Sequence, residues 1–117
     1  MTHAITVHTP ADPPRRLVLM FHGVGASPAD LVPLGQALAD VMADALIISI
    51  QSPQPSGIGS GWEWFSVLGI TESNRVPRVA QAMPSFAATV RHWQQLARVD
   101  AANTVLIGFS QGAIMVL

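Results

Sequence analysis

The chain has 117 residues, a formal net charge of −1, and no Cys, Lys or Tyr. The missing cysteines exclude a thiolate nucleophile, a disulfide framework and Cys-ligated zinc or iron–sulfur sites. The missing lysines exclude a Walker-A loop and Schiff-base chemistry. The six basic residues are arginines scattered between positions 15 and 98, so we expect no basic face and no nucleic-acid partner. The histidines lack metal-ligand spacing, and we expect no metal site.

Half of the residues are apolar and only 11% are charged, whereas ordinary soluble domains carry about 25% charged residues. The longest apolar runs fall far below the roughly 20 residues of a membrane-spanning helix, so we expect no transmembrane segment. The first four residues have neither the basic nor the apolar region of a signal peptide, which predicts a cytoplasmic protein. The low charge therefore indicates segments that are buried on both sides.

The sequence pattern of residues 5–41 predicts two strands and a helix. Ile5–His8 is a candidate edge strand, and Leu17–Phe21 is a continuous apolar run typical of parallel sheets covered on both faces. Ser27 is predicted to cap a helix, with Pro28 at its first position and Asp30 completing a capping box. The expected apolar stripe of this helix consists of Leu31, Leu34, Leu38 and Val41.

The second part begins with another strand of the buried type, Ala45–Ile50, and a Gly-, Pro- and Ser-rich loop over residues 51–61. An amphipathic pattern then stays in phase across Pro84, which predicts one kinked helix. Its apolar face consists of Val79, Met83, Phe86, Val90, Trp93 and Ala97. Thr104–Gly108 predicts a third buried strand. This alternation predicts an α/β fold with a mostly parallel sheet and helices on both faces.

The segment Gly108–Gly112 has the pattern G-x-S-x-G between a predicted strand and a predicted helix. In that context the turn forces the serine into a strained backbone conformation and raises its hydroxyl at the carboxyl edge of the sheet. Ser110 is therefore the candidate nucleophile, and the backbone N–H of Gln111 is a candidate donor to a developing oxyanion. The alternative is an ordinary strand-to-helix turn built from small residues.

A second glycine-rich turn, Phe21–Gly25, comes at the end of the first buried strand. In serine hydrolases this position supplies the other half of the oxyanion hole, and we expect the Val24 N–H to act together with that of Gln111. Such a turn can also cradle a phosphate. A dinucleotide fingerprint needs a third glycine where this chain has Pro28, which removes most of the support for phosphate binding.

Two roles are open to His22, which lies in the same turn. It can be the general base, or it can be a buried histidine that braces the loop through hydrogen bonds. We expect the bracing role, because in this fold class the base follows the serine in the chain. The residues expected to support the two turns are His22, Gly23, Gly25, Gly108 and Gly112.

The aromatic segment Trp62–Phe65 follows the second buried strand, which places it at the sheet edge where doubly wound proteins bind ligands. Trp64 and Phe65 are therefore candidates for the wall of an acyl pocket. The alternative is that these rings cap the core beneath a long loop.

Taken together, these motifs resemble the phospholipase/carboxylesterase family of α/β-hydrolases, which includes acyl-protein thioesterases and small bacterial carboxylesterases. The matching segments are Phe21–Gly25, Trp64–Val67, Gly69–Arg75 and Ile107–Ala113. The resemblance implies an α/β-hydrolase fold and hydrolysis of small-molecule carboxylic esters, thioesters or lysophospholipids by a Ser-Asp-His triad without a cofactor. It makes Ser110 the nucleophile, with Val24 and Gln111 as oxyanion donors.

The Asp and His of such a triad do not follow the serine in this chain. Seven residues follow Ser110, and none is Asp, Glu or His, whereas such domains have about twice this length. We therefore expect residues 1–117 to be the N-terminal part of a single α/β-hydrolase domain, truncated after the nucleophile elbow and inactive alone. The other interpretations are a non-catalytic α/β binding module, and a peptidase or dienelactone-type hydrolase on the same fold.

Overall fold

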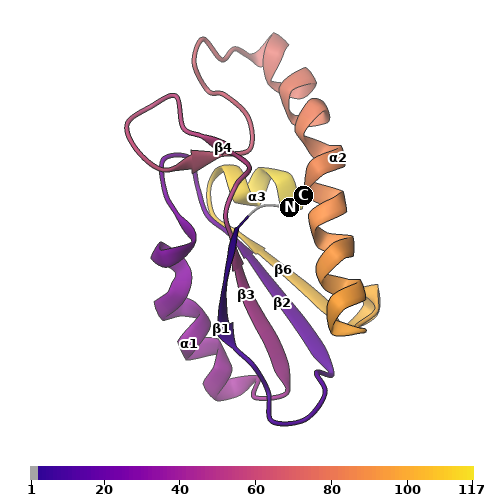
Figure 1. Cartoon of the computed structure of the whole chain (residues 1–117). Helices are drawn as coiled ribbons and strands as arrows, with labels where there is room; N and C mark the ends of the chain where they lie inside the picture. Colours follow the sequence, from indigo (N-terminus) through magenta and orange to yellow (C-terminus); the bar gives the residue numbers. More distant parts are fainter. Residues whose placement is uncertain (1–2) are drawn as a thin grey trace.

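A four-stranded sheet forms the centre of the computed structural model, which describes residues 3–117 (Figure 1). The strands are β1 (Ala4–His8), β2 (Arg16–Phe21), β3 (Ala45–Ile50) and β6 (Thr104–Gly108), in the spatial order β1-β3-β2-β6. β2 runs parallel to both β3 and β6, and β1 pairs antiparallel with β3 at one edge. The predicted mostly parallel sheet with an edge strand at the N-terminus is confirmed.

Helices cover both faces of this sheet (Figure 1). The helical segments are η1 (Pro28–Leu31), α1 (Val32–Val41), α2 (Glu72–Ala97), η2 (Ala101–Asn103) and α3 (Gln111–Val116). Alternate residues of β2 face opposite sides, as the pleat of a strand requires. Val18 and Met20 pack toward η1 and α1, whereas Leu17, Leu19 and Phe21 pack toward α2 and α3. β2 and β3 are mostly apolar and buried because both of their faces are covered. β6 was expected to be buried in the same way, but none of its residues is fully buried and Val105 is exposed.

The first predicted helix differs from expectation at both ends. The Asp30 carboxylate accepts a hydrogen bond from the Ser27 backbone N–H at 2.9 Å, so the capping interaction is present. The first turn is nevertheless a 3₁₀ helix, because Pro33 lacks an N–H and its ring disfavours α geometry in the preceding turn. Val41 was expected on the apolar stripe but is 76% exposed. Met42, the residue directly after α1, packs against the core cluster under this helix instead.

Helix α2 is longer than the apolar pattern indicated. It begins after Thr71, whose side chain accepts a hydrogen bond from the Asn74 N–H, and it runs continuously across Pro77 and Pro84. The six residues predicted for its apolar face all belong to the core cluster or pack against it. The prediction of one helix across Pro84 is therefore confirmed.

The region expected to be an irregular loop contains a small hairpin. Strand β4 (Gln54–Pro55) pairs antiparallel with β5 (Trp62–Glu63), and left-handed glycines at 59 and 61 form the connection. Strands of two residues are too short to produce a periodic pattern, so the sequence carries no signal for them.

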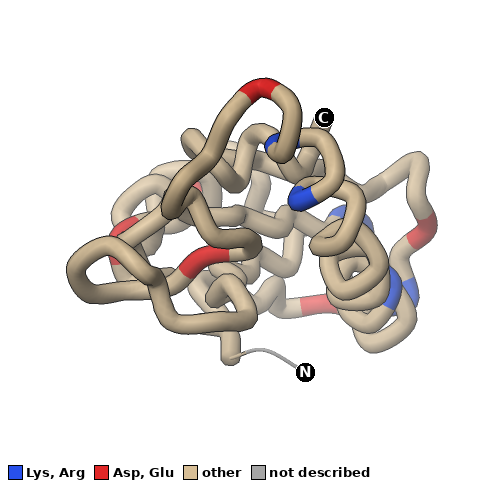
Figure 2. The backbone as a smooth tube through the Cα atoms, turned by 90° about the horizontal axis from the view of Figure 1, so that it is seen from above, with Lys and Arg blue, Asp and Glu red and all other residues tan. Residues whose placement is uncertain are grey.

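Charged residues are unevenly distributed over this fold. Figure 2 shows basic positions gathered along α2, where four of the six arginines lie within the helix or directly after it, at positions 75, 78, 91 and 98. One of them, Arg78, donates hydrogen bonds to the carbonyl oxygens of Ser66 and Leu68, so it holds a neighbouring loop. Across residues 3–117, no helix combines the length and the apolar character needed to cross a membrane.

Candidate active site

Ser110 stands between β6 and α3 in a conformation that side-chain-bearing residues rarely adopt. Its φ is 52° and its ψ is −114°, and a positive φ is sterically costly for any residue other than glycine. The surrounding chain leaves no room for larger residues. A Cβ atom on Gly108 would lie 2.4 Å from the Ala113 nitrogen. Strand, strained serine and helix thus form the geometry that the G-x-S-x-G pattern indicates.

The glycine-rich turn after β2 lies directly beside this serine. A Cβ atom placed on Gly23 would be 3.2 Å from the Cβ and 3.9 Å from the Oγ of Ser110. Gly25, two residues later, has a φ of +77°, which closes the turn. The motifs Phe21–Gly25 and Gly108–Gly112 are 87 residues apart in the sequence, yet the parallel pairing of β2 with β6 brings them together.

The two backbone amides expected to bind an oxyanion are unused by the fold. In the turn after β2, Gly25 donates to the Trp62 carbonyl and Ala26 donates to that of Gly23. In the elbow, the Gly112 amide donates to the Phe109 carbonyl. Hydrogen bonds within residues 3–117 leave the Val24 and Gln111 amides without an acceptor. Such donors beside a nucleophile are the groups that stabilise a tetrahedral oxyanion.

His22 is held by the backbone on both sides of its ring. Nδ1 lies 2.8 Å from the Gly23 carbonyl oxygen, and Nε2 accepts a hydrogen bond from the Ser52 N–H at 3.0 Å. These partners require the neutral tautomer with the proton on Nδ1. Burial lowers the pKa of His22, although its hydrogen bond to Gly23 and the charge of Asp30 oppose the shift. With both nitrogens occupied, the ring braces the loop and has no free atom to accept a proton from serine.

Trp64 and Phe65 lie mainly in the core. Trp64 packs against Phe86 with the ring centroids 5.3 Å apart, and it also contacts Phe21. Both residues additionally line a cavity of about 360 Å³ beside α2. The other lining residues are Gln54, Ser66, Arg78, Gln81 and Ala82, and Ser110 is not among them. The ring contacts with Phe21 and Phe86 fit the core-capping alternative, and the acyl-wall role stays a prediction.

The side chain of Gln111 has a role that the sequence did not indicate. Its Oε1 accepts a hydrogen bond from the Trp64 N–H at 2.7 Å, and its Nε2 donates to the Phe65 carbonyl oxygen at 2.8 Å. Only the backbone N–H of this residue was expected to matter. The partners are 46 and 47 residues away in the chain, so no local pattern could have predicted the contact.

Glu63 is a second buried polar residue near the site that the sequence did not indicate. Its carboxylate accepts hydrogen bonds from the Gly57 N–H at 2.8 Å and from Gln54 Nε2 at 2.9 Å. These bonds close the β4–β5 hairpin at its base. The carboxylate therefore has a structural role. Its two hydrogen bonds account for its burial, and no catalytic role is needed to explain it.

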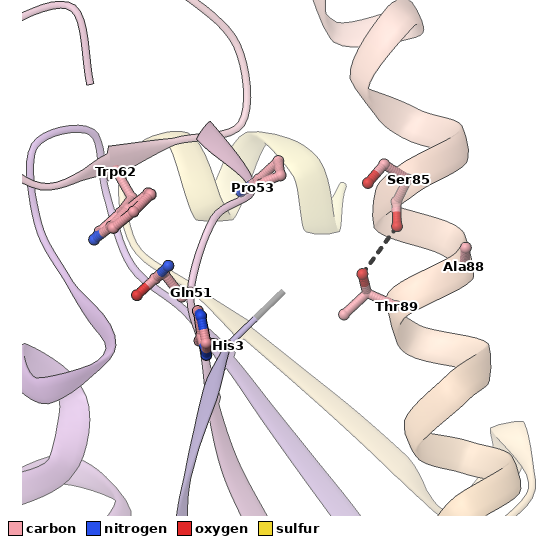
Figure 3. Close-up of a pocket in the computed structure, with 7 residues that line it drawn as sticks. All are labelled: His3, Gln51, Pro53, Trp62, Ser85, Ala88 and Thr89. Atoms are coloured by element: carbon pink, nitrogen blue, oxygen red, sulfur yellow. Dashed lines mark hydrogen bonds between the residues drawn. The ribbon is translucent and has the colours of Figure 1, made fainter. Parts of the chain in front are cut away.

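A second cavity, of about 600 Å³, lies between α2 and the segment after β3 (Figure 3). It is lined by His3, Gln51, Pro53, Trp62, Ser85, Ala88 and Thr89. Thr89 donates a hydrogen bond to the Ser85 carbonyl oxygen within its own helix. No group of three or more His, Asp or Glu side chains suited to a metal ion occurs among residues 3–117.

Comparisons with known proteins agree with this geometry. The phospholipase/carboxylesterase family matches residues 2–117. The chain is 50% identical over 111 residues to the esterase YpfH of Escherichia coli, a match that covers 95% of this chain and 48% of the relative. The crystal structure of esterase PE8 superposes with a TM-score of 0.86 at 27% identity, covering 97% of this chain and 54% of the other.

A further solved structure, the carboxylesterase of Bacillus cereus, shares the fold with a TM-score of 0.74 at 22% identity, covering 99% of this chain and 51% of that chain. This chain therefore spans about half the length of the relatives it matches. The fold, the elbow with its facing glycine turn, and the match over residues 2–117 lead to one conclusion. The chain belongs to the phospholipase/carboxylesterase family of α/β-hydrolases.

Proposed function

We propose that residues 1–117 form the N-terminal part of a single α/β-hydrolase domain and supply the nucleophile and oxyanion donors of a serine carboxylesterase. The observation that carries this proposal is the contact between the Gly23 turn and Ser110 in its strained elbow. That contact places two unused amides, from Val24 and Gln111, on loops beside the serine hydroxyl. A binding module has no need for a strained serine facing two free donors.

In the proposed reaction, the Ser110 oxygen attacks the carbonyl carbon of an ester and its proton passes to a general base. The base and its acidic partner come from the half of the domain that the relatives possess and this chain does not cover. The Val24 and Gln111 amides hold the negative oxygen of the tetrahedral intermediate. The alcohol leaves with the proton, and water then hydrolyses the acyl-enzyme to release the acid and regenerate Ser110.

The proposed substrates are small carboxylic esters. Thioesters and lysophospholipids pass through the same tetrahedral intermediate, so they fall within the same proposal. The mechanism uses backbone donors, a serine and a proton acceptor, and it requires no cofactor. The cytoplasmic location and the absence of a nucleic-acid partner stay predictions from the sequence.

The test uses a reconstituted enzyme, in which residues 1–117 are fused to the part of the E. coli esterase that lies outside the matched region. Folding is checked by circular dichroism and by a cooperative thermal transition, and turnover is measured with p-nitrophenyl acetate. We expect the fusion to hydrolyse the ester, whereas the 117-residue chain alone does not. Ser110→Ala is expected to lower kcat by at least about 10⁴-fold, because the nucleophile is lost.

Ser85→Ala is the matched control, because this serine is exposed on α2. It should leave turnover unchanged. Labelling with a fluorophosphonate and mass spectrometry of the labelled peptide should identify Ser110. A folded fusion that is inactive, or one whose turnover survives Ser110→Ala, contradicts the proposal.

A further inference from the structure

We propose that the side chain of Gln111 is a positioning residue, which acts through the segment Trp62–Phe65 to hold the two oxyanion-donor loops at a fixed separation. This inference rests on the proposed function and deepens it. It assigns a second role to a residue whose backbone N–H is already a proposed donor.

The first link joins the elbow to this segment. The Gln111 side chain is 2% exposed, and both ends of its amide are used, one by the Trp64 N–H and the other by the Phe65 carbonyl oxygen. One partner donates and the other accepts, so the amide has a single orientation in which both bonds form. Reversing it would place like groups against each other in a buried site, which is costly. The elbow is therefore fixed to residues 64 and 65.

The second link joins the same segment to the other donor loop. The Trp62 carbonyl oxygen accepts a hydrogen bond from the Gly25 N–H at 3.1 Å, and the Trp62 N–H donates to the Ala26 carbonyl oxygen at 3.0 Å. The neighbouring chain fits closely as well, since a Cβ on Gly61 would lie 2.3 Å from the Gly25 carbonyl oxygen. Val24 directly precedes this pair of bonds.

The four residues from 62 to 65 are thus bonded to the Val24 loop at one end and to the Gln111 side chain at the other. An oxyanion donor is effective only when it is held within hydrogen-bond distance of the developing charge. A change in the spacing of the two loops moves one donor away from that position. The Gln111 side chain accordingly acts on the reaction without touching substrate.

The test compares three variants in the reconstituted enzyme. Gln111→Met removes both bonds but keeps the backbone N–H. Gln111→Glu keeps the acceptor for Trp64, and it can donate to the Phe65 carbonyl only when its carboxyl is protonated. Gln95→Glu, an exposed glutamine on α2 changed in the same way, is the matched control.

At pH 8 we expect both Gln111 variants to lower kcat by at least about 30-fold with KM changed by less than about 3-fold, because one donor is displaced. For Gln111→Glu, the ratio of variant to wild-type kcat should rise at least about 5-fold between pH 8 and pH 6 as protonation restores the second bond. The ratio should stay flat for Gln111→Met and near one for Gln95→Glu.

A merely structural role gives a different result. The kcat per folded molecule of both Gln111 variants would then equal the wild-type value at pH 8 and at pH 6, and only the folded fraction would fall. This finding overturns the inference. If neither Gln111 variant folds, hydrogen exchange of the wild-type enzyme provides the test. The amides of Gly25, Trp62 and Trp64 should then exchange with the same opening free energy. Different opening free energies would overturn the inference.

The two proposals fail in distinguishable ways. Turnover that survives Ser110→Ala overturns the proposed function and, with it, the positioning role. Turnover that is lost in Ser110→Ala but keeps wild-type kcat in Gln111→Met leaves the proposed function standing and overturns the positioning role alone.

Discussion

Gly112, in the first turn of α3, lies directly against the carbonyl oxygen of Phe21 at the end of β2, where a Cβ atom would stand only 2.2 Å from that oxygen. Backbone meets backbone at this point, so no side chain can move aside. The close approach lets the elbow sit against the strand that carries the other donor loop.

Gly112→Ala is therefore expected to destabilise the reconstituted enzyme by about 3 kcal/mol, because β2 and α3 must separate to admit the methyl group. Turnover should fall with it, since the two donor loops separate as well. Gly59→Ala is the control: Gly59 also has a positive φ, but a Cβ there meets nothing within 4 Å. Its cost should be about 1 kcal/mol, from backbone strain alone. Urea unfolding measures both, and equal effects would contradict the packing argument.

The buried ring of His22 predicts a pH dependence of stability. Its pKa is lowered in the folded protein, so the unfolded chain takes up the proton first as the pH falls below the ordinary pKa of 6.5. The stabilisation is complete above that pH and is lost as the pH falls toward the folded pKa. We expect the free energy of unfolding to decrease below about pH 6.5, and this decrease to be smaller in His22→Gln.

Urea unfolding at pH values from 5 to 8 measures these slopes. His92→Asn, which removes a histidine on α2, is the matched control. A slope that His22→Gln leaves at its wild-type value would show that another group causes the acid sensitivity.

We expect two substitutions of Glu63 to lower the free energy of unfolding by different amounts. Glu63→Ala leaves the Gly57 N–H and the Gln54 amide without their acceptor and should cost about 2 kcal/mol. Glu63→Gln should cost less than about 1 kcal/mol, because the Gln54 amide can turn over and offer its oxygen to the new NH₂ group. Limited proteolysis within residues 51–61 should accelerate only for Glu63→Ala. Equal acceleration in both variants would mean that the negative charge, and not the hydrogen bonds, holds the hairpin.

Strand β6 pairs with β2 alone in the described part of the chain, and Val105 on it is 39% exposed. An unpaired edge of this kind can add strands from another copy. We expect the 117-residue chain to self-associate and Val105→Lys to reduce the association, as measured by size-exclusion chromatography with light scattering. Val41→Lys is the control, because Val41 is 76% exposed but lies on α1. If both substitutions reduce association equally, exposed apolar area and not the strand edge is responsible.

The central strands of the fold can be predicted from the sequence because burial on both faces makes β2 and β3 nearly continuous apolar runs. β6 is also predicted from its apolar residues, but it is only half-buried to exposed in the described part of the chain. The strained serine was predictable too, since the glycines flanking it reflect a local steric need. The prediction for Val41 is wrong because the expected stripe begins at Leu31, in a 3₁₀ turn where the spacing of about 3.6 residues per turn does not hold.

The rest of the site depends on contacts that leave no local trace. A glutamine that bonds two backbone groups nearly fifty residues away has the same sequence neighbours as any other glutamine. Glu63 likewise serves donors in a hairpin too short to show a pattern. The hydrogen bonds of both side chains depend on groups that the tertiary structure brings near them. The periodicity of the sequence carries no information about such contacts.

The closure of the β4–β5 hairpin at Glu63 separates the tip of this loop from its base. Residues 58–60 stand beyond the hydrogen bonds to Gln54 and Gly57, while Trp62 and Trp64 bond to the donor loops below them. The tip nevertheless packs against the turn after β2, because a Cβ atom on Gly25 would lie 3.5 Å from the Ser60 carbonyl oxygen and 3.6 Å from that of Ile58. A change in the tip is therefore transmitted by backbone packing to the turn that carries Val24, the proposed oxyanion donor.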